Sequence, residues 1–255
     1  MKNIDYLTFG AHRLGQLKAL HLEGDFDSVI NLLQGQVTSD CRKLKDGEGQ
    51  PSALCDEKGY VLCNFDILLH KNLVLIAIDD ELESIFLDEM RKFAPFYKVA
   101  IKPIDITFAG WIRKPNEDML PNEQLIITAD NAYVSLLASS SSKEIDKNAE
   151  DTASMNWSLN RMLLEDHIIQ KKDSCKYRPH ELMQNISRVS FSKGCFRGQE
   201  IIARMEYLAK QKKQTSLVIH ASQEEVQKFE IIGQTLNING KYFSSCLGTK
   251  DLFNY

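Results

Sequence analysis

Residues 193–200, KGCFRGQE, place one cysteine in a setting that suits chemistry. Cys195 lies between Gly194 and Gly198, and Lys193 and Arg197 supply positive charge on either side. The apolar spacing in the following GQEIIARMEYL predicts a short helix that begins near Gly198, with its unpaired N–H groups toward the loop. Cations and a helix start both favour the thiolate form of a cysteine. The pattern therefore indicates a reactive thiol or an anion-binding loop.

The same segment has interpretations that involve no chemistry. Cysteine is often buried as a small apolar side chain, and glycines can serve backbone geometry alone. Glu200 and Arg204 stand four residues apart and can form a simple helix-surface ion pair. No histidine is adjacent in sequence, although His167 and His180 could approach Cys195 in space.

Composition sets the class of protein. A chain of 255 residues with 43% hydrophobic content can form one large domain or two to three small ones. Six cysteines are scattered without a C-x-x-C pattern, so neither a disulfide framework nor a metal site is indicated. The opening residues lack the apolar core of a secretory signal, and the apolar run at residues 73–78 is too short to cross a bilayer. We expect a cytoplasmic protein with no membrane partner.

The net charge of −4 conceals an asymmetry. Residues 161–214 carry twelve lysines and arginines against six aspartates and glutamates. Such a basic segment indicates an anionic ligand or partner near the cysteine motif, and its alternative is a solvated basic surface.

The hydrophobic pattern predicts the elements that must position the motif. Helices are expected at residues 25–35, 79–93 (with Asp79 or Asp80 as cap), 153–168 and 198–208, and the polar run 139–151 is expected to be a linker or the entry to a helix. Strands are expected at residues 14–24, 52–56, 60–70, 72–78, 97–101, 106–112, 124–130, 133–139, 215–221 and 230–247. Asn239 and Gly240 predict a type I′ hairpin turn inside the last of these.

Several blocks together resemble a known family. FSKGCFRGQEIIARMEYLAKQKK resembles the signature of the YgfZ family of folate-binding proteins. The blocks LLQGQVTSD, ALCDEKGYVL, WSLNRM and RPHE are similar to further motifs of that family, in the same order and along nearly the whole chain. One departure is that Glu165, Asp166 and His167 stand where the family usually has G-x-P.

The resemblance implies a fold. YgfZ proteins share the fold of the glycine-cleavage aminomethyltransferase, so we expect an α+β chain with subdomains around a central folate cavity and a small β C-terminal part. The expected boundaries are residues 1–105 and 106–214 for two α+β subdomains, interleaved with each other, and 215–255 for the C-terminal segment.

The resemblance also implies site residues. Cys195 matches the family's functional thiol, and we expect it to be exposed at the cavity rim. The five other cysteines lie in apolar or strand-like contexts and should react more slowly. Trp157 and Arg161 match a block that lines the folate cavity, where the indole would stack on a pterin and the basic segment would suit an anionic tail. A buried core role is the alternative for Trp157. The remaining expected contacts to tetrahydrofolate or a folate derivative are Gln36, Lys193, Gly194, Gly198, Gln199, Glu200 and Arg204.

Two functions are consistent with this resemblance. The first is a folate-binding accessory protein, without turnover of its own, that supports assembly or repair of iron–sulfur enzymes, including enzymes that modify tRNA. Its partners would be iron–sulfur proteins or assembly factors, with indirect rather than direct contact to tRNA. The second is a folate-dependent aminomethyl or methyl transferase, which needs an acid or base beside the pterin. Asp40 and Asp56 lie in matched motifs and are the candidates, although both could be turn or cap residues.

Overall fold

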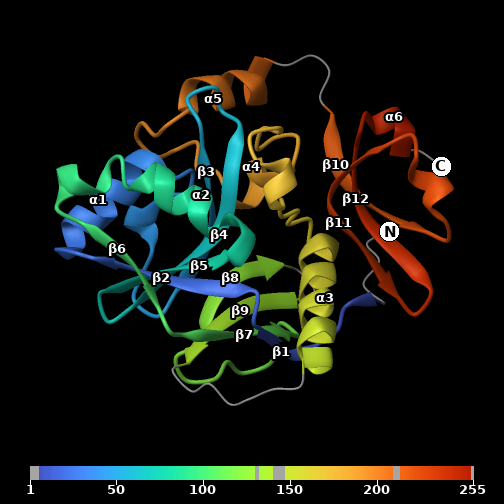
Figure 1. Cartoon of the computed structure of the whole chain (residues 1–255), viewed down its shortest axis with the longest axis horizontal. Coiled ribbons are helices and arrows are strands. Elements are labelled where there is room, and N and C mark those ends of the chain that lie inside the picture. Colours follow the sequence, from blue (N-terminus) through green and yellow to red (C-terminus); the bar gives the residue numbers. More distant parts are fainter. Residues whose placement is uncertain (1–5, 130–131, 140–146, 209–212, 254–255) are drawn as a thin grey trace.

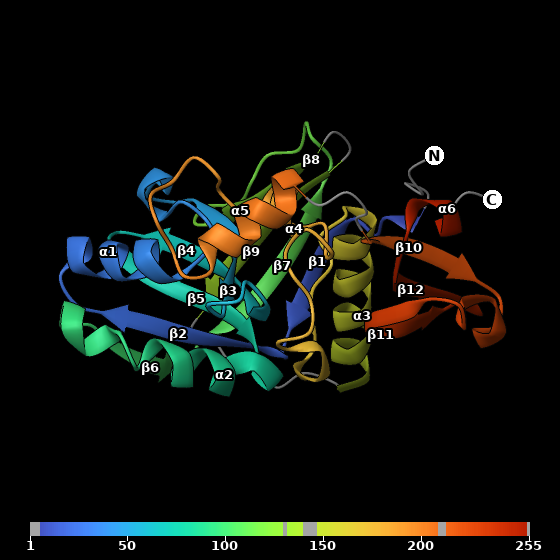
Figure 2. The ribbon, with the colours of Figure 1, turned by 90° about the horizontal axis from the view of Figure 1, so that it is seen from above.

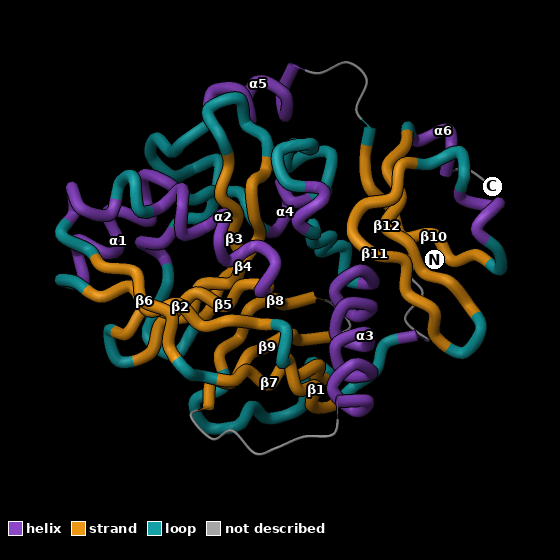
Figure 3. Tube along the Cα trace, viewed as in Figure 1, coloured by secondary structure: helices purple, strands orange, loops and turns teal. Residues whose placement is uncertain are grey.

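The computed structural model describes residues 6–129, 132–139, 147–208 and 213–253. Three antiparallel sheets and the helices between them make up these residues (Figure 1). Figure 3 shows two of the sheets together in the body of the molecule and the third apart from them near the C-terminus. The α+β fold class expected from the sequence is confirmed.

The largest sheet has five strands in the order β3-β4-β5-β2-β6. Its strands are β2 (Leu17–Glu23), β3 (Gly49–Cys55), β4 (Val61–His70), β5 (Leu73–Asp79) and β6 (Ala100–Ile104). Both faces of its central strands are covered, which explains the unbroken apolar run in β5. Ile76 and Ile78 belong to the core beside the helices, and Leu75 and Ala77 belong to the core beside the second sheet.

Two helices cover the first face of this sheet: α1 (Phe26–Gln36) and α2 (Asp80–Met90). Each begins at an aspartate whose side chain accepts a hydrogen bond from a backbone N–H of the first turn. Asp25 accepts from Ser28 and Asp79 accepts from Glu81. The expected cap at Asp79 is thereby confirmed.

The second sheet has the order β1-β7-β9-β8, and its strands are β1 (Gly10–Leu14), β7 (Thr107–Arg113), β8 (Gln124–Ala129) and β9 (Ala132–Ser139). The first strand of the chain thus pairs with a strand about a hundred residues later. The helix α3 (Lys147–Leu163) packs against this sheet, and a methyl group at Gly110 would lie 2.4 Å from the Trp157 ring. Gly110 therefore allows the close approach of helix and strand.

The third sheet forms the C-terminal part in the order β10-β12-β11, with strands β10 (Gln214–His220), β11 (Glu230–Ile238) and β12 (Lys241–Gly248) and the short helix α6 (Lys250–Phe253). Asn239 and Gly240 both have positive φ, 52° and 78°, so the predicted type I′ turn is confirmed. Figure 2 shows α3 between this sheet and the rest of the molecule. Leu159 and Met162 of α3 pack there against Leu236 and Phe243.

Helix boundaries differ from the sequence prediction at one place that matters for the site. The helix expected at residues 153–168 ends at Leu163, because Glu165 adopts a left-handed φ of 61° and the chain turns. The helix begins at Lys147, so the interpretation of the polar run as the entry to a helix is confirmed from that residue on. Residues 140–146 of the run lie outside the described residues. Two further helices follow, α4 (Gln184–Ser187) and the expected α5 (Gln199–Leu208).

The expected division at residues 105 and 214 stays a prediction. Within the described residues, β1 joins the sheet formed by residues 107–139. None of the described helices has the length and apolar character needed to cross a membrane.

Candidate functional site: a central pocket and a separate thiol loop

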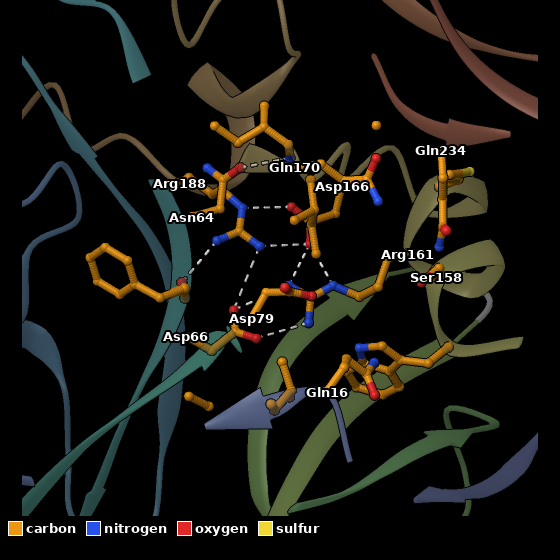
Figure 4. Close-up of a pocket in the computed structure, with 18 residues that line it drawn as sticks. Gln16, Asn64, Asp66, Asp79, Ser158, Arg161, Asp166, Gln170, Arg188 and Gln234 are labelled. Carbon is orange, nitrogen blue, oxygen red and sulfur yellow. Dashed lines mark hydrogen bonds and ion pairs between the residues drawn. The ribbon is translucent and has the colours of Figure 1, made fainter. Parts of the chain in front are cut away.

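A pocket with about 760 Å³ of empty space, part of it continuous with solvent, lies where the five-stranded sheet, α3 and β11 meet (Figure 4). Its floor comes from β2, β4 and β5, one wall comes from α3 and the segment after it, and β11 closes another side. The lining residues are Gln16, Leu17, Asn64, Phe65, Asp66, Ala77, Asp79, Trp157, Ser158, Arg161, Met162, Asp166, Ile168, Ile169, Gln170, Arg188, Gly233 and Gln234.

Two arginines and two aspartates form a buried charge cluster in the pocket wall: Arg161, Arg188, Asp66 and Asp166. Arg161 donates from Nη1 and Nη2 to the two Asp66 oxygens at 3.0 and 3.1 Å and from Nε to Asp166 Oδ2 at 2.5 Å. Arg188 donates from Nε and Nη2 to Asp166 at 2.7 and 2.9 Å. Its Nη1 donates to two backbone carbonyl oxygens. The four charges therefore cancel within the fold.

The cluster remains ionised despite its burial. Burial alone would raise the pKa of Asp166, but the adjacent Arg161 and Arg188 guanidinium groups hold that pKa well below its usual range. Paired in this way, Arg161 lines the pocket as expected, yet its positive charge is neutralised by aspartates of this chain. A role of Arg161 toward an anionic tail stays a prediction, and the aspartate pairs reduce the charge that it can offer.

Trp157 satisfies both interpretations of the sequence. Its side chain lines the pocket, while it is only 4% exposed and packs in the core beside Gly110 and Leu14. The Arg161 guanidinium carbon lies 5.4 Å from the centre of the indole ring. The charge cluster thus fixes the orientation of the one tryptophan in the pocket wall.

Asp79 is a pocket residue that the sequence singled out only as a helix cap. Burial, with a smaller contribution from the neighbouring Asp80 and Glu81 carboxylates, raises the pKa of Asp79 to about 6, and the backbone hydrogen bond from Glu81 acts against this rise. Gln16, from the turn before β2, also lines the pocket, and its buried Oε1 has no hydrogen-bond partner. Sequence reasoning missed both residues, although an aspartate at the end of a buried strand was a usable signal.

The Cys195 loop lies outside this pocket. Cys195 is exposed, as expected, and it is not among the residues that line this pocket; its expected place at the cavity rim stays a prediction. The loop is tied to the end of α1. Lys193 Nζ donates to the carbonyl oxygens of Val37 and Ser39 at 2.7 and 2.9 Å, and the Arg197 backbone N–H donates to the Gly35 carbonyl.

Both cations of the loop hold the scaffold rather than the thiol. Burial against carbonyl groups lowers the pKa of Lys193 to about 8. The Arg197 side chain pairs with Glu57 and Glu89, each at 2.7 Å. Both cations therefore have partners other than the Cys195 thiol. Among the described residues, no group of three or more His, Cys, Asp or Glu side chains is placed to hold a metal ion.

The two glycines beside Cys195 have different roles. Gly198 has a φ of 80°, and a Cβ there would lie 2.4 Å from the Asp56 carbonyl oxygen, so only glycine fits. A Cβ on Gly194 would meet no atom within 4 Å. The helix α5 begins directly afterwards at Gln199 and Glu200, and Arg204 is exposed on it.

The remaining predicted residues also lie away from the pocket lining. Gln36 is buried at the end of α1, and its Oε1 has no partner. Asp40 accepts hydrogen bonds from the Arg42 backbone and the Gln34 side chain. Asp56 accepts from the backbone N–H groups of residues 58 and 60. Both aspartates therefore act as turn and cap residues, which was the alternative interpretation.

A second exposed thiol was not expected. Cys175 is exposed, with a left-handed φ of 62°, and its sulfur lies 3.6 Å from Asp56 Oδ2. The prediction that all five other cysteines lie in apolar or strand-like contexts is wrong for Cys175, because a turn brings it to the surface. Burial and the Asp56 carboxylate raise the pKa of this thiol.

Comparison with known proteins tests the resemblance seen in the motifs. Three proteins named tRNA-modifying protein YgfZ are similar to this chain. The protein from Vibrio atlanticus is 26% identical over 78% of the chain. Those from Colwellia psychrerythraea and Pectobacterium atrosepticum are each 28% identical, over 89% and 70% of the chain. The resemblance to the YgfZ family is confirmed. The matched regions cover 66%, 76% and 61% of those relatives, so the chain spans about two thirds of their length. No protein-family model matches.

A solved structure supports the fold. The aminomethyltransferase T of the glycine cleavage system from Bartonella henselae is similar over 96% of this chain and 80% of its own, with a TM-score of 0.60 and 11% identity. The YgfZ-like blocks fall on two places in this fold. The tryptophan block lies in the pocket wall, and the cysteine block lies on the loop that is tied to α1.

Proposed function

We propose that this chain is a tetrahydrofolate-binding accessory protein that supports the assembly or repair of iron–sulfur enzymes, including tRNA-modifying ones, through the thiol of Cys195. The observation that carries the folate part is the pocket: a flat indole, apolar side chains and a few polar groups line a space that opens to solvent. The similarity to proteins named tRNA-modifying protein YgfZ supports the functional class.

The pocket residues fit a folate ring. Trp157 offers an aromatic wall, and Gln16 Oε1 is a buried acceptor without a partner, which a ring N–H could satisfy. Asp79 adds a carboxylate that forms no ion pair within the described part of the chain. A bound tetrahydrofolate would supply a carrier for one-carbon units, and the chain's own contribution is to bind and orient it and to exclude water.

Cys195 supports the accessory role better than a transferase role. Its thiol is exposed on a loop outside the pocket, where another protein can reach it. A transferase needs an acid or base beside the ring, and the two candidates expected from the sequence, Asp40 and Asp56, cap backbone turns away from the pocket lining, which leaves Asp79 as the pocket carboxylate without a cation partner. Iron–sulfur proteins or assembly factors are the proposed partners, contact with tRNA is proposed to be indirect, and a cytoplasmic location stays a prediction.

Fluorescence titration tests the ligand. The chain has two tryptophans, of which Trp157 lines the pocket and Trp111 does not. We expect 5-formyltetrahydrofolate to quench the emission saturably in the wild type and in Trp111→Phe. The quenching should be largely lost in Trp157→Phe. Absence of saturable quenching in wild type up to millimolar ligand would contradict folate binding.

Complementation tests the thiol. Cells that lack their own YgfZ protein would receive wild type, Cys195→Ala or the matched control Cys175→Ala. We expect wild type and Cys175→Ala to restore the activity of iron–sulfur enzymes in extracts, and Cys195→Ala to fail although it is present at normal amounts. Full rescue by Cys195→Ala would overturn the proposed role of this residue.

A further inference from the structure

The polar side chains that line the pocket differ in whether they already have hydrogen-bond partners within the chain. Most polar side chains in the wall are occupied by partners within the chain. Arg161 and Arg188 donate to aspartates and carbonyl oxygens, and Asn64 exchanges hydrogen bonds with Gln184 and the Ile169 backbone. The pocket therefore presents no free cation among its described lining residues, and a ligand there meets a wall of already satisfied donors.

Two acceptors of the pocket lining stand out. The Oε1 atom of Gln16 is buried without a partner, and the Asp79 carboxylate accepts a hydrogen bond from the backbone N–H of Glu81 and forms no ion pair with a described cation. They are neighbours across two strands, because Asp79 pairs with Leu17 and the Asp80 backbone N–H donates to the Gln16 carbonyl at 2.9 Å. Figure 4 shows both side chains among the sticks that line the pocket.

We infer that Asp79 and Gln16 form a recognition edge that selects flat heterocycles with adjacent N–H donors, such as the amino-oxo edge of a pterin ring. The inference deepens the proposed function and rests on it, because it names the residues that set ligand class. A carboxylate accepts two parallel N–H bonds, and the amide oxygen accepts a third. A ring that presents a carbonyl oxygen instead would face the carboxylate with a lone pair and be rejected.

The same edge makes binding depend on pH. The pKa of Asp79 is about 6, raised by burial and by Asp80 and Glu81 on its own helix. The pocket lining also includes the buried charge cluster, whose two arginines and two aspartates cancel. Below pH 6 the acid is protonated and loses part of its acceptor capacity, so affinity should fall by about tenfold per pH unit.

The experiment uses the full chain and three probes: pterin, lumazine and 5-formyltetrahydrofolate. Lumazine carries a carbonyl oxygen where pterin carries the 2-amino group. Binding is measured by calorimetry at pH 5 and pH 7 with wild type, Asp79→Asn, Gln16→Leu and the matched control Asp80→Asn, whose carboxylate does not line the pocket.

We expect wild type to prefer pterin over lumazine by about tenfold or more at pH 7, since a hydrogen bond to a charged group contributes that much. Asp79→Asn should lose about tenfold in affinity for pterin together with the pH dependence, and Gln16→Leu should weaken pterin binding less. Asp80→Asn should keep the wild-type affinity for pterin at pH 7, with its pH dependence moved to lower pH because one carboxylate beside Asp79 is gone. If Asp79→Asn does not fold, the inference is tested by the ratio of the wild-type affinities for pterin and lumazine and by the pH profile of wild-type binding.

The outcomes separate this inference from the proposed function. Binding of 5-formyltetrahydrofolate with no discrimination between pterin and lumazine, or with an unchanged pH profile in Asp79→Asn, would overturn the inference and leave folate binding standing. Discrimination for pterin without binding of 5-formyltetrahydrofolate would support the inference and contradict folate as ligand. Absence of binding by all three probes would overturn both.

Discussion

In the pocket wall, Arg161 and Arg188 are buried against aspartates, whereas at the thiol loop Lys193 is buried against backbone carbonyl oxygens. Carboxylate partners keep the pocket cluster ionised, and the pKa of Asp166 lies well below its usual range. Carbonyl dipoles compensate less, so the pKa of Lys193 falls to about 8. In both regions the cations stabilise the scaffold. The groups without such partners are Asp79 and Gln16 in the pocket and Cys195 on the loop, and these are the groups that we expect to bind a ligand or to react.

The largest expected effect comes from breaking the pocket cluster. Arg188→Met should reduce the free energy of unfolding by about 3–5 kcal/mol, because it leaves Asp166 buried with one cation fewer. Urea unfolding followed by circular dichroism measures this. The control Lys102→Met removes an exposed ion pair with Glu23 and should cost less than about 1 kcal/mol. Equal effects of the two substitutions would show that the cluster is not a structural element.

Substitution of the two glycines in the thiol loop should lower the free energy of unfolding by different amounts. Gly198→Ala should destabilise by about 2–4 kcal/mol, since it combines a positive φ with a Cβ against the Asp56 carbonyl. Gly194→Ala has open space and should cost less than about 1 kcal/mol. Urea unfolding measures both effects. A Gly198→Ala variant as stable as wild type would show that the positive φ and the close Asp56 carbonyl do not require glycine at this position.

The pH dependence of stability should identify Asp79 as a carboxylate without a cation. Its pKa in the folded state, about 6, lies above its ordinary value near 4, so its stabilising contribution is complete below pH 4 and is lost as pH rises through 6. The partial exposure of Asp79 reduces the loss to about 1 kcal/mol. Relative to Asp79→Asn, the wild type should therefore lose stability between pH 4 and 7. Parallel unfolding curves for the two proteins across that window would contradict this.

The smallest structural effect concerns the two exposed thiols. Cys195→Ala should change the free energy of unfolding by less than about 1 kcal/mol, because the side chain is exposed. Alkylation by iodoacetamide at pH 7.5, followed by mass spectrometry, should label Cys195 before Cys175, whose pKa is raised by burial and by Asp56.

Asp56→Asn sharpens this comparison of thiols. It should accelerate the labelling of Cys175 several-fold, because the Asp56 carboxylate lies beside the Cys175 sulfur. The labelling rate of Cys195 should stay unchanged. Asparagine retains an oxygen that can accept the turn's backbone hydrogen bonds. Equal acceleration of both thiols would indicate a general loosening of the loop.

Features that depend on neighbouring residues were predictable from the sequence. The apolar run of β5, the Asp79 cap of α2 and the type I′ turn at Asn239 and Gly240 are each determined within a few residues. The helix after Gly198 and the exposure of Cys195 also follow from local pattern. The motif blocks, which are local too, were sufficient to identify the resemblance to the YgfZ family and with it the α+β fold.

What only the tertiary structure decided depends on partners distant in the chain. Asp66 neutralises Arg161 across 95 residues, and Lys193 reaches the end of α1 across more than 150. The sequence pattern carries no sign of such long-range pairs. A count of charged residues therefore includes both cations without the partners that neutralise or bury them. The same holds for Asp79 and Gln16: burial beside a pocket, rather than their residue types, leaves them as acceptors without partners, and burial is a property of the assembled fold.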